Sequence, residues 1–103
     1  MYKGLVTKQV AEKLLADVRE DYSFWCCDGR IFRNMRDLMV GLASMSTDTF
    51  SYHLNHAKND FSKWVYDVIG DEQLADDLSN STSQREAART VNERYSYLVK
   101  KSS

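Results

Sequence analysis

The stretch from Ser46 to Gly70 constrains the fold most, because it is the longest strongly periodic part of the sequence. Its apolar side chains recur every three or four residues and fall within about 80° of one another on a helix. They are Phe50, Leu54, Ala57, Phe61, Trp64 and Val68. Ser46 can cap the N-terminus of a helix, and Gly70 can end it in the left-handed conformation. The pattern predicts one continuous amphipathic helix.

The rest of the chain also favours helices, because its 103 residues include no proline and only four glycines. Shorter apolar periodicities and capping residues predict further helices on both sides of the central one. Their expected ranges are residues 6–21, 34–45, 72–78 and 84–100. We therefore expect a single domain, residues 1–103, with a mostly α fold: a compact bundle of four to five helices.

A small β-hairpin is expected near residues 22–33, where the spacing of apolar side chains changes. The pair Asp28-Gly29 lies between two apolar runs, which is a strong signal for a two-residue hairpin turn. That turn would place Cys26 opposite Ile31 and Trp25 opposite Phe32. A plain loop with a single turn is the alternative.

The charge balance argues against nucleic acid as the main partner. Fourteen basic and fifteen acidic residues give a net charge of −1, without the basic excess of most nucleic-acid binders. Nucleic-acid or ribosome association is nevertheless kept as an alternative, and it would depend on Arg30, Arg33 and Arg36 around the hairpin.

A cytoplasmic protein without a membrane partner is expected. No segment has the ~18 consecutive apolar residues that span a bilayer. The N-terminal residues 1–18 have charges among their apolar positions, which predicts an amphipathic helix rather than a signal peptide. The two cysteines, Cys26 and Cys27, are adjacent, and neighbouring cysteines rarely form a disulfide with each other, so we expect two reduced thiols.

The central part of the chain resembles a small family of uncharacterised prokaryotic, mostly archaeal, proteins. The motifs are Asp-Gly-Arg at 28–30, Met-Ser-x-x-Thr-Phe at 45–50, Asn-Asp-Phe-x-x-Trp at 59–64 and Gly-Asp at 70–71. The resemblance covers about residues 22 to 78, and the paired cysteines and His56 depart from the family pattern. Because the family has no known activity, the resemblance implies none for this chain.

His53, His56 and Asp60 are the candidate metal ligands. On one continuous helix they would lie within about 60° of one another, and imidazole and carboxylate groups bind zinc or ferrous iron. One straight helix rarely surrounds a metal, however, so hydrogen-bonded or solvated polar side chains are the preferred interpretation. A zinc site that includes the cysteines is a weaker alternative, because neighbouring residues on a strand point to opposite faces and the usual C-x₂-C spacing is missing. A catalytic Cys–His pair is also weaker, because one cysteine and one histidine are a weak signal. No cofactor is expected.

A polar strip beside the apolar stripe is the candidate interaction surface. Exposed aromatic side chains next to charged ones are common at protein interfaces, although core packing and an ordinary solvated surface are the preferred interpretation of such residues in a small protein. The strip consists of Tyr52, Asn59, Asp60, Lys63, Trp64 and Asp67. No catalytic or nucleotide-binding motif is present. The favoured function is therefore non-enzymatic: a protein–protein interaction module, or a small subunit of a larger assembly, that binds another protein or itself. A metal-binding protein or metal-dependent enzyme that uses His53, His56 and Asp60 is the alternative.

The C-terminal helix, residues 84–101, is a second candidate for docking. Its apolar seam is narrow and includes Val91, Tyr95 and Leu98, a spacing that suits packing on a single partner helix. That partner helix belongs either to another molecule or to this chain, where the N-terminal helix is the simplest choice.

Overall fold

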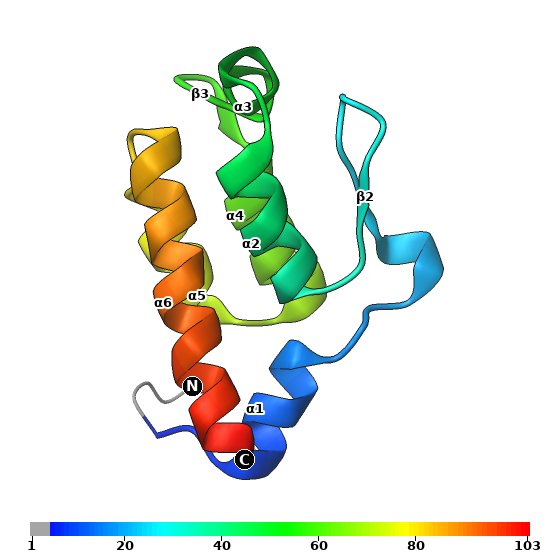
Figure 1. Cartoon of the computed structure of the whole chain (residues 1–103), viewed down its shortest axis with the longest axis vertical. Coiled ribbons are helices and arrows are strands. Elements are labelled where there is room, and N and C mark those ends of the chain that lie inside the picture. Colours follow the sequence, from blue (N-terminus) through cyan, green and yellow to red (C-terminus); the bar gives the residue numbers. More distant parts are fainter. Residues whose placement is uncertain (1–4) are drawn as a thin grey trace.

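Helices dominate the fold, as the sequence predicts, and two small antiparallel hairpins complete it (Figure 1). The computed structural model describes residues 5–103. In chain order the elements are α1 (Lys8–Leu15), the 3₁₀-helix η1 (Glu20–Tyr22), strands β1 (Phe24–Trp25) and β2 (Ile31–Phe32), α2 (Met35–Ser44), α3 (Thr47–His53), strands β3 (Leu54–Asn55) and β4 (Lys58–Asn59), α4 (Asp60–Trp64), the π-helix η2 (Val65–Ile69), α5 (Glu72–Ser79) and α6 (Gln84–Ser102). The mostly α class with a small hairpin is thus confirmed.

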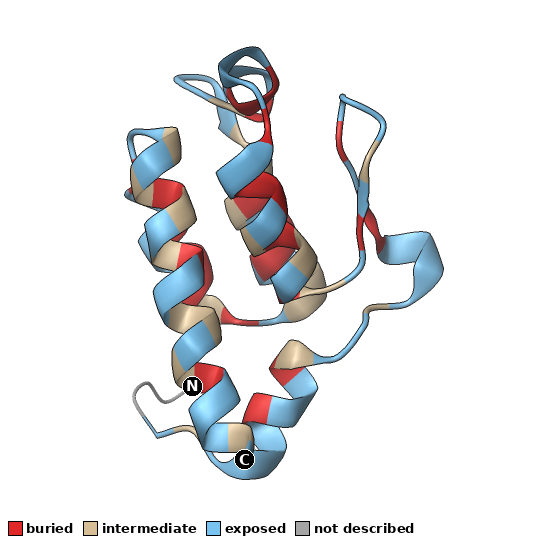
Figure 2. Ribbon diagram, in the orientation of Figure 1, coloured by how far each residue is buried: buried red, intermediate tan, exposed pale blue. Residues whose placement is uncertain are grey.

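The long helix α6 packs along α2 and α5, and its C-terminal part packs on α1 (Figure 1). The β1–β2 hairpin lies on the other side of α2 from α6, and α3 with β3 lies at the top of the view. Buried residues follow the facing sides of these elements (Figure 2). The core therefore lies between α2 and α4, which we call the central helices, the β1–β2 hairpin and α6.

Aromatic rings form the part of the core that joins the hairpin to the central helices. The ring of Phe24 stacks on Phe32 at 5.6 Å and on Phe61 at 5.4 Å between centroids. The ring of Phe50 also stacks on Phe61, at 5.7 Å between centroids. Phe61 is fully buried, so it has the central place in the core that its position in the apolar stripe predicts.

The prediction of one continuous helix over Ser46–Gly70 is wrong. The chain leaves the helix after His53, forms the β3–β4 hairpin, and resumes a helical path at Asp60. Asn55 stabilises the break, because its side chain accepts a hydrogen bond from the amide of Ala57 and donates one to the carbonyl of Ser51. Such local side-chain bonds compete with helical ones, and asparagine is especially suited to them.

The helix restarts with a new cap, which explains why most of the apolar stripe is still buried. The side chain of Asn59 accepts a hydrogen bond from the amide of Ser62 and donates one to the carbonyl of Leu78 at the end of α5. Among the stripe residues, Ala57 lies in the turn and is exposed. The break accounts for the additional helix beyond the expected four to five.

The first helix is shorter than predicted. It ends at Leu15, and Ala16 is already extended, so Val18 lies in the segment that leads to η1. The amide of Val18 instead donates a hydrogen bond to the carbonyl of Arg33. The predicted N-terminal helix also included residues 1–4, which lie outside the described residues.

The β1–β2 hairpin is present, but its register differs by one residue from the predicted one. Phe24 pairs with Phe32, and Trp25 pairs with Ile31. The loop has three residues rather than two: the amide of Gly29 donates to the carbonyl of Cys26, and Gly29 has a φ of 98°. A turn followed by a left-handed glycine is typical of three-residue hairpin loops.

Helix α2 approaches the hairpin closely at Gly41. A Cβ atom at this position would lie only 2.7 Å from Cε1 of Phe32. The ring of Phe32 is itself buried, so it has little room to move away. Gly41 therefore lets β2 pack directly on the helix, although glycine lowers helix propensity.

Helix α6 packs against its own chain. Val91 and Leu98 are fully buried where α6 meets the neighbouring helices, and Tyr95 is half-buried. Arg94 of α6 also donates hydrogen bonds to both carboxylate oxygens of the buried Asp71, at 2.8 and 3.0 Å. The apolar seam of α6 thus packs on helices of the same chain, which is the intramolecular alternative for this helix.

Candidate functional site

His53, the last residue of α3, connects three parts of the chain. Its ring is buried, with 4% of the residue exposed, and it contacts the rings of Phe24 and Phe61. Nε2 accepts a hydrogen bond of 3.0 Å from the backbone amide of Cys27 in the hairpin loop. Nδ1 lies 2.9 Å from Oδ2 of Asp60, the first residue of α4. Because Nε2 accepts a hydrogen bond from an amide N–H, the ring hydrogen lies on Nδ1, which donates a hydrogen bond to Asp60.

Asp60 is shared between His53 and a lysine. Nζ of Lys58 lies 2.9 Å from the same carboxylate oxygen, and this ammonium also lies over the ring of Tyr52 at 4.3 Å. Burial on its own would raise the pKa of Asp60, but the hydrogen bonds from His53 and Lys58 outweigh it, and the pKa is lowered from its usual value of 3.8. Asp60 is therefore a structural carboxylate that stays ionised.

The chain Asp60–His53–Cys27 has the order of a catalytic triad but not its function. In a triad the Nε2 lone pair takes a proton from the nucleophile, whereas here it is used by the amide of Cys27. The other thiol, Cys26, is buried, and burial raises its pKa, which disfavours the reactive thiolate. The arrangement therefore stabilises the hairpin and offers no free base.

The structure does not bring the three candidate metal ligands together through one helix. His53 and Asp60 meet because the chain turns back between α3 and α4, while His56 is exposed in the turn between β3 and β4. Within residues 5–103 no three His, Cys, Asp or Glu side chains are grouped so that they could hold a metal ion. The geometric reason for a metal site, the grouping of the three residues on one side of a continuous helix, is therefore wrong.

Several residues of the predicted interaction surfaces are buried. Trp64 is buried, and its indole N–H donates a 2.8 Å hydrogen bond to the carbonyl of Tyr22. Val91 and Leu98 lie in the packing of α6, as described above. Tyr52 is exposed but lies on α3, separated from the α4 part of the strip by the β3–β4 hairpin.

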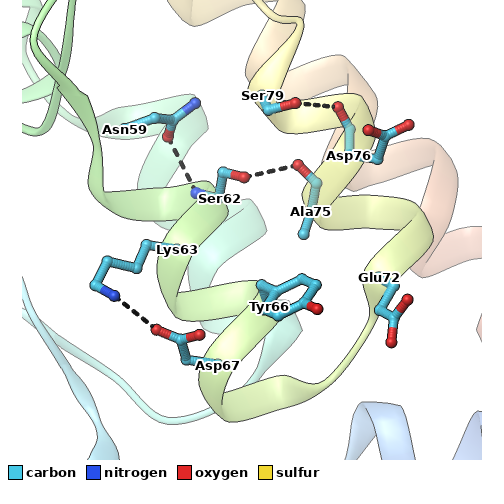
Figure 3. Close-up of a pocket in the computed structure, with 9 residues that line it drawn as sticks. All are labelled: Asn59, Ser62, Lys63, Tyr66, Asp67, Glu72, Ala75, Asp76 and Ser79. Atoms are coloured by element: carbon cyan, nitrogen blue, oxygen red, sulfur yellow. Dashed lines mark hydrogen bonds and ion pairs between the residues drawn. The ribbon is translucent and has the colours of Figure 1, made fainter.

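Three strip residues, Asn59, Lys63 and Asp67, do line one groove, between α4–η2 and α5 (Figure 3). We call it the α4–α5 groove. Its volume is about 480 Å³, within the usual range of ligand pockets. The remaining lining residues are Ser62, Tyr66, Glu72, Ala75, Asp76 and Ser79.

The α4–α5 groove has excess negative charge. Lys63 is its one cation, and its ammonium lies 2.9 Å from the carboxylate of Asp67 (Figure 3). Glu72 and Asp76 are one helical turn apart on α5, and neither carboxylate has an ion-pair partner among residues 5–103. Like charges at this spacing destabilise a helix slightly, so a cationic ligand would be favourable here. Tyr66, which is 57% exposed, supplies an aromatic face.

A second surface lies on the β1–β2 hairpin and the adjoining side of α2. Trp25 is 71% exposed, the largest fraction among the large apolar side chains of the described residues. Its cross-strand neighbour Ile31 is also exposed, and Ile31 and Val40 line a shallow hollow between β2 and α2. We call Trp25, Ile31 and Val40 together the hairpin patch.

Arginines surround the hairpin patch, but they differ in how far they are neutralised. Arg30 is held by Asp28, at 3.0 Å, and donates a hydrogen bond to Ser44. Arg33 lies 3.7 Å from Glu20. Arg36 lines the hollow, is exposed, and has no ion pair or hydrogen bond within the part of the chain that the structure describes. It is therefore the free cation of this surface.

The sequence interpretation missed the hairpin patch because the register was wrong. In the predicted pairing Trp25 faced Phe32, which would have placed the tryptophan on the same face as a core residue. The alternation along β1 carries the correct signal, since Phe24 and Cys26 are buried while Trp25 between them is exposed. For the α4–α5 groove, the acidic composition of residues 71–77 was the available signal.

No helix among residues 5–103 has the length and apolar character needed to cross a membrane. Comparisons with protein-family models, with curated proteins and with solved structures find no match.

Proposed function

We propose that the protein is a non-enzymatic interaction module that binds a partner protein through the hairpin patch. The observation that carries this proposal is the exposure of Trp25 on an ordered hairpin. Tryptophan, with arginine and tyrosine, is enriched among the residues that dominate binding energy, and exposed apolar patches often mark protein interfaces.

The hairpin is well prepared for binding because its other face is anchored. Phe24 and Phe32 are buried in the aromatic core, and the amide of Cys27 is bound by His53. Asp28 stabilises the loop: hydrogen bonds from the amide and then from the guanidinium of Arg30 lower its pKa to about 2. A surface that is already ordered loses less conformational entropy on association, so more of the contact energy is available for affinity.

The partner that fits best has an apolar pocket for Trp25 and carboxylates near Arg36. Charge complementarity of this kind raises association rates and excludes wrong partners. Single-stranded nucleic acid is the second candidate, because an exposed tryptophan beside arginines can stack on bases. The near-neutral charge of the chain and the neutralisation of Arg30 and Arg33 favour a protein.

The test compares proteins captured from a nuclease-treated extract of the source cells by the parent chain, Trp25→Ala and Tyr52→Ala. Trp25 is exposed, so Trp25→Ala should keep its urea midpoint, with a stability change within about 0.5 kcal/mol. Tyr52→Ala also loses the contacts of the Tyr52 ring with Lys58 and His53, so it should be slightly less stable, and the comparison is made where both variants are folded. We expect Trp25→Ala to lose the captured partner and Tyr52→Ala to keep it. Retention by Trp25→Ala, or loss by both variants, contradicts the proposal. Loss from the parent after nuclease treatment alone indicates nucleic acid.

Two further parts of the proposal depend on the sequence. A cytoplasmic location is supported by two free cysteines, which are typical of reducing compartments. Membership of the uncharacterised archaeal family is supported by the quoted motifs, and it adds no activity.

A further inference from the structure

We propose that the partner of the hairpin patch is a second copy of this chain, which receives the patch in its α4–α5 groove. This inference depends on the proposed function, because it names the partner of the same surface. Each chain carries both surfaces, and they share no residue. The contact is therefore head-to-tail.

Charge is the first argument for this pairing. Arg36 is the free cation beside the hairpin patch, and Glu72 and Asp76 are the free carboxylates of the groove. Arg–carboxylate pairs are well suited to interfaces because the guanidinium is planar and weakly hydrated. One copy thus supplies the charge that the other lacks, and the net charge of −1 gives little repulsion between copies.

Shape and side-chain type are the second argument. Trp25 projects from an anchored hairpin, and the groove of about 480 Å³ can hold an indole ring. Tyr66 stands at the groove with its ring exposed, whereas Ala75, in the wall between the helices, is almost fully buried and leaves the ring of Tyr66 as the main apolar contact (Figure 3). Aromatic pairs of this kind add stability beyond the apolar area that they bury.

A head-to-tail contact has a consequence that a two-fold contact lacks. Because a bound pair of copies still has one free patch and one free groove, association continues into a ring or a chain of subunits. The assembly should grow with protein concentration and weaken with salt, since part of its stability comes from ion pairs.

The test uses sedimentation velocity of the full chain up to about 0.5 mM, which covers weak association. We expect the parent to assemble and Trp25→Ala, Arg36→Glu and Asp76→Arg each to lose at least about tenfold in affinity. Arg85→Glu, at an exposed arginine of α6 outside both surfaces, is the matched control and should assemble like the parent.

Mixing Arg36→Glu with Asp76→Arg gives the decisive result. The first variant keeps an intact groove and the second an intact patch, so the mixture should form a complex although neither variant assembles alone. A parent that stays monomeric overturns the self-docking inference, as does a mixture that forms no complex. If the parent is monomeric yet captures another protein through Trp25, the proposed function stands and only self-docking fails.

Discussion

Replacing His53 tests the part of the structure that holds the hairpin. In the variant His53→Ala the amide of Cys27 loses its acceptor, and Asp60 loses one of its two donors. The imidazole ring also disappears from its contacts with Phe24 and Phe61, at centroid distances of 5.0 and 5.4 Å. We therefore expect a large loss of stability from one side chain.

The magnitude follows from these lost interactions. The amide of Cys27 is part-buried, so leaving it without its acceptor costs about 1–2 kcal/mol, and the cavity left by the ring adds about 1–2 kcal/mol. Asp60 contributes less, because it is partly exposed and keeps its bond to Lys58. The expected total is about 2–4 kcal/mol, a large part of the stability of a small domain.

Urea unfolding, followed by far-UV circular dichroism, measures this loss. With a slope of about 1–3 kcal/mol per molar urea, the midpoint of His53→Ala should fall by roughly 1–3 M. His56→Ala is the matched control, because this exposed histidine lies in the turn between β3 and β4 and should change stability by less than about 0.5 kcal/mol. His53→Phe keeps a ring but no acceptor, so it should cost about 1–3 kcal/mol.

Two results would refute this reasoning. If His53→Ala is no less stable than His56→Ala, the imidazole does not connect the hairpin to the helices. If His53→Phe is as stable as the parent, ring packing alone explains the effect and the hydrogen bond from Cys27 contributes nothing measurable.

Three further predictions test other parts of the structure. Gly41→Ala should lower stability by about 1–2 kcal/mol in urea unfolding, because crowding against Phe32 exceeds the gain in helix propensity, and an unchanged midpoint would contradict the close contact. The pKa of Asp60 is lowered on folding, so its contribution to stability is present above its unfolded pKa near 3.8 and is lost as pH falls through the lower folded value. The stability difference between the parent and Asp60→Asn should therefore shrink below about pH 4. A difference that stays constant with pH would disprove this coupling. Truncation after Ser81 should abolish the cooperative melt, whereas a truncated chain that still melts cooperatively would show that α6 is not part of the core.

The helices that begin with a side-chain cap were predictable from the sequence. Asn34 accepts a hydrogen bond from the amide of Asp37, and Asp71 accepts one from Leu74, as their spacing indicates. Ser83 likewise caps α6. These signals depend only on neighbouring residues, so they can be recognised without knowledge of the tertiary structure.

The break in the central helix could not be predicted from periodicity. The apolar spacing continues across residues 54–59 although the helix does not. It continues because both halves of the segment bury large side chains in the same core. Phe50 and Phe61 stack on each other from separate helices, at 5.7 Å, although the pattern placed them on one. The competing signal was Asn55 and Asn59, whose side chains make the turn and the new cap.

This break also explains why the predicted strip was only partly right. Asn59, Lys63 and Asp67 follow the break and keep a common helical face, so they line one groove. Tyr52 precedes the break, so the β3–β4 hairpin separates it in sequence from these three residues. Tyr52 therefore does not share their helical face. Angular reasoning from sequence is thus reliable only within one uninterrupted helix.

The hairpin patch shows the same dependence on one local detail. A loop of three residues rather than two shifts the pairing by one position, and a shift of one position exchanges the faces of a strand. The shift results from Gly29 at the third loop position, where its positive φ is easily adopted. Trp25 therefore faces solvent because of a glycine four residues away. A substitution at Gly29 that shifts the strand pairing to a loop of another length would alter binding by the hairpin patch, although no residue of the patch itself is changed.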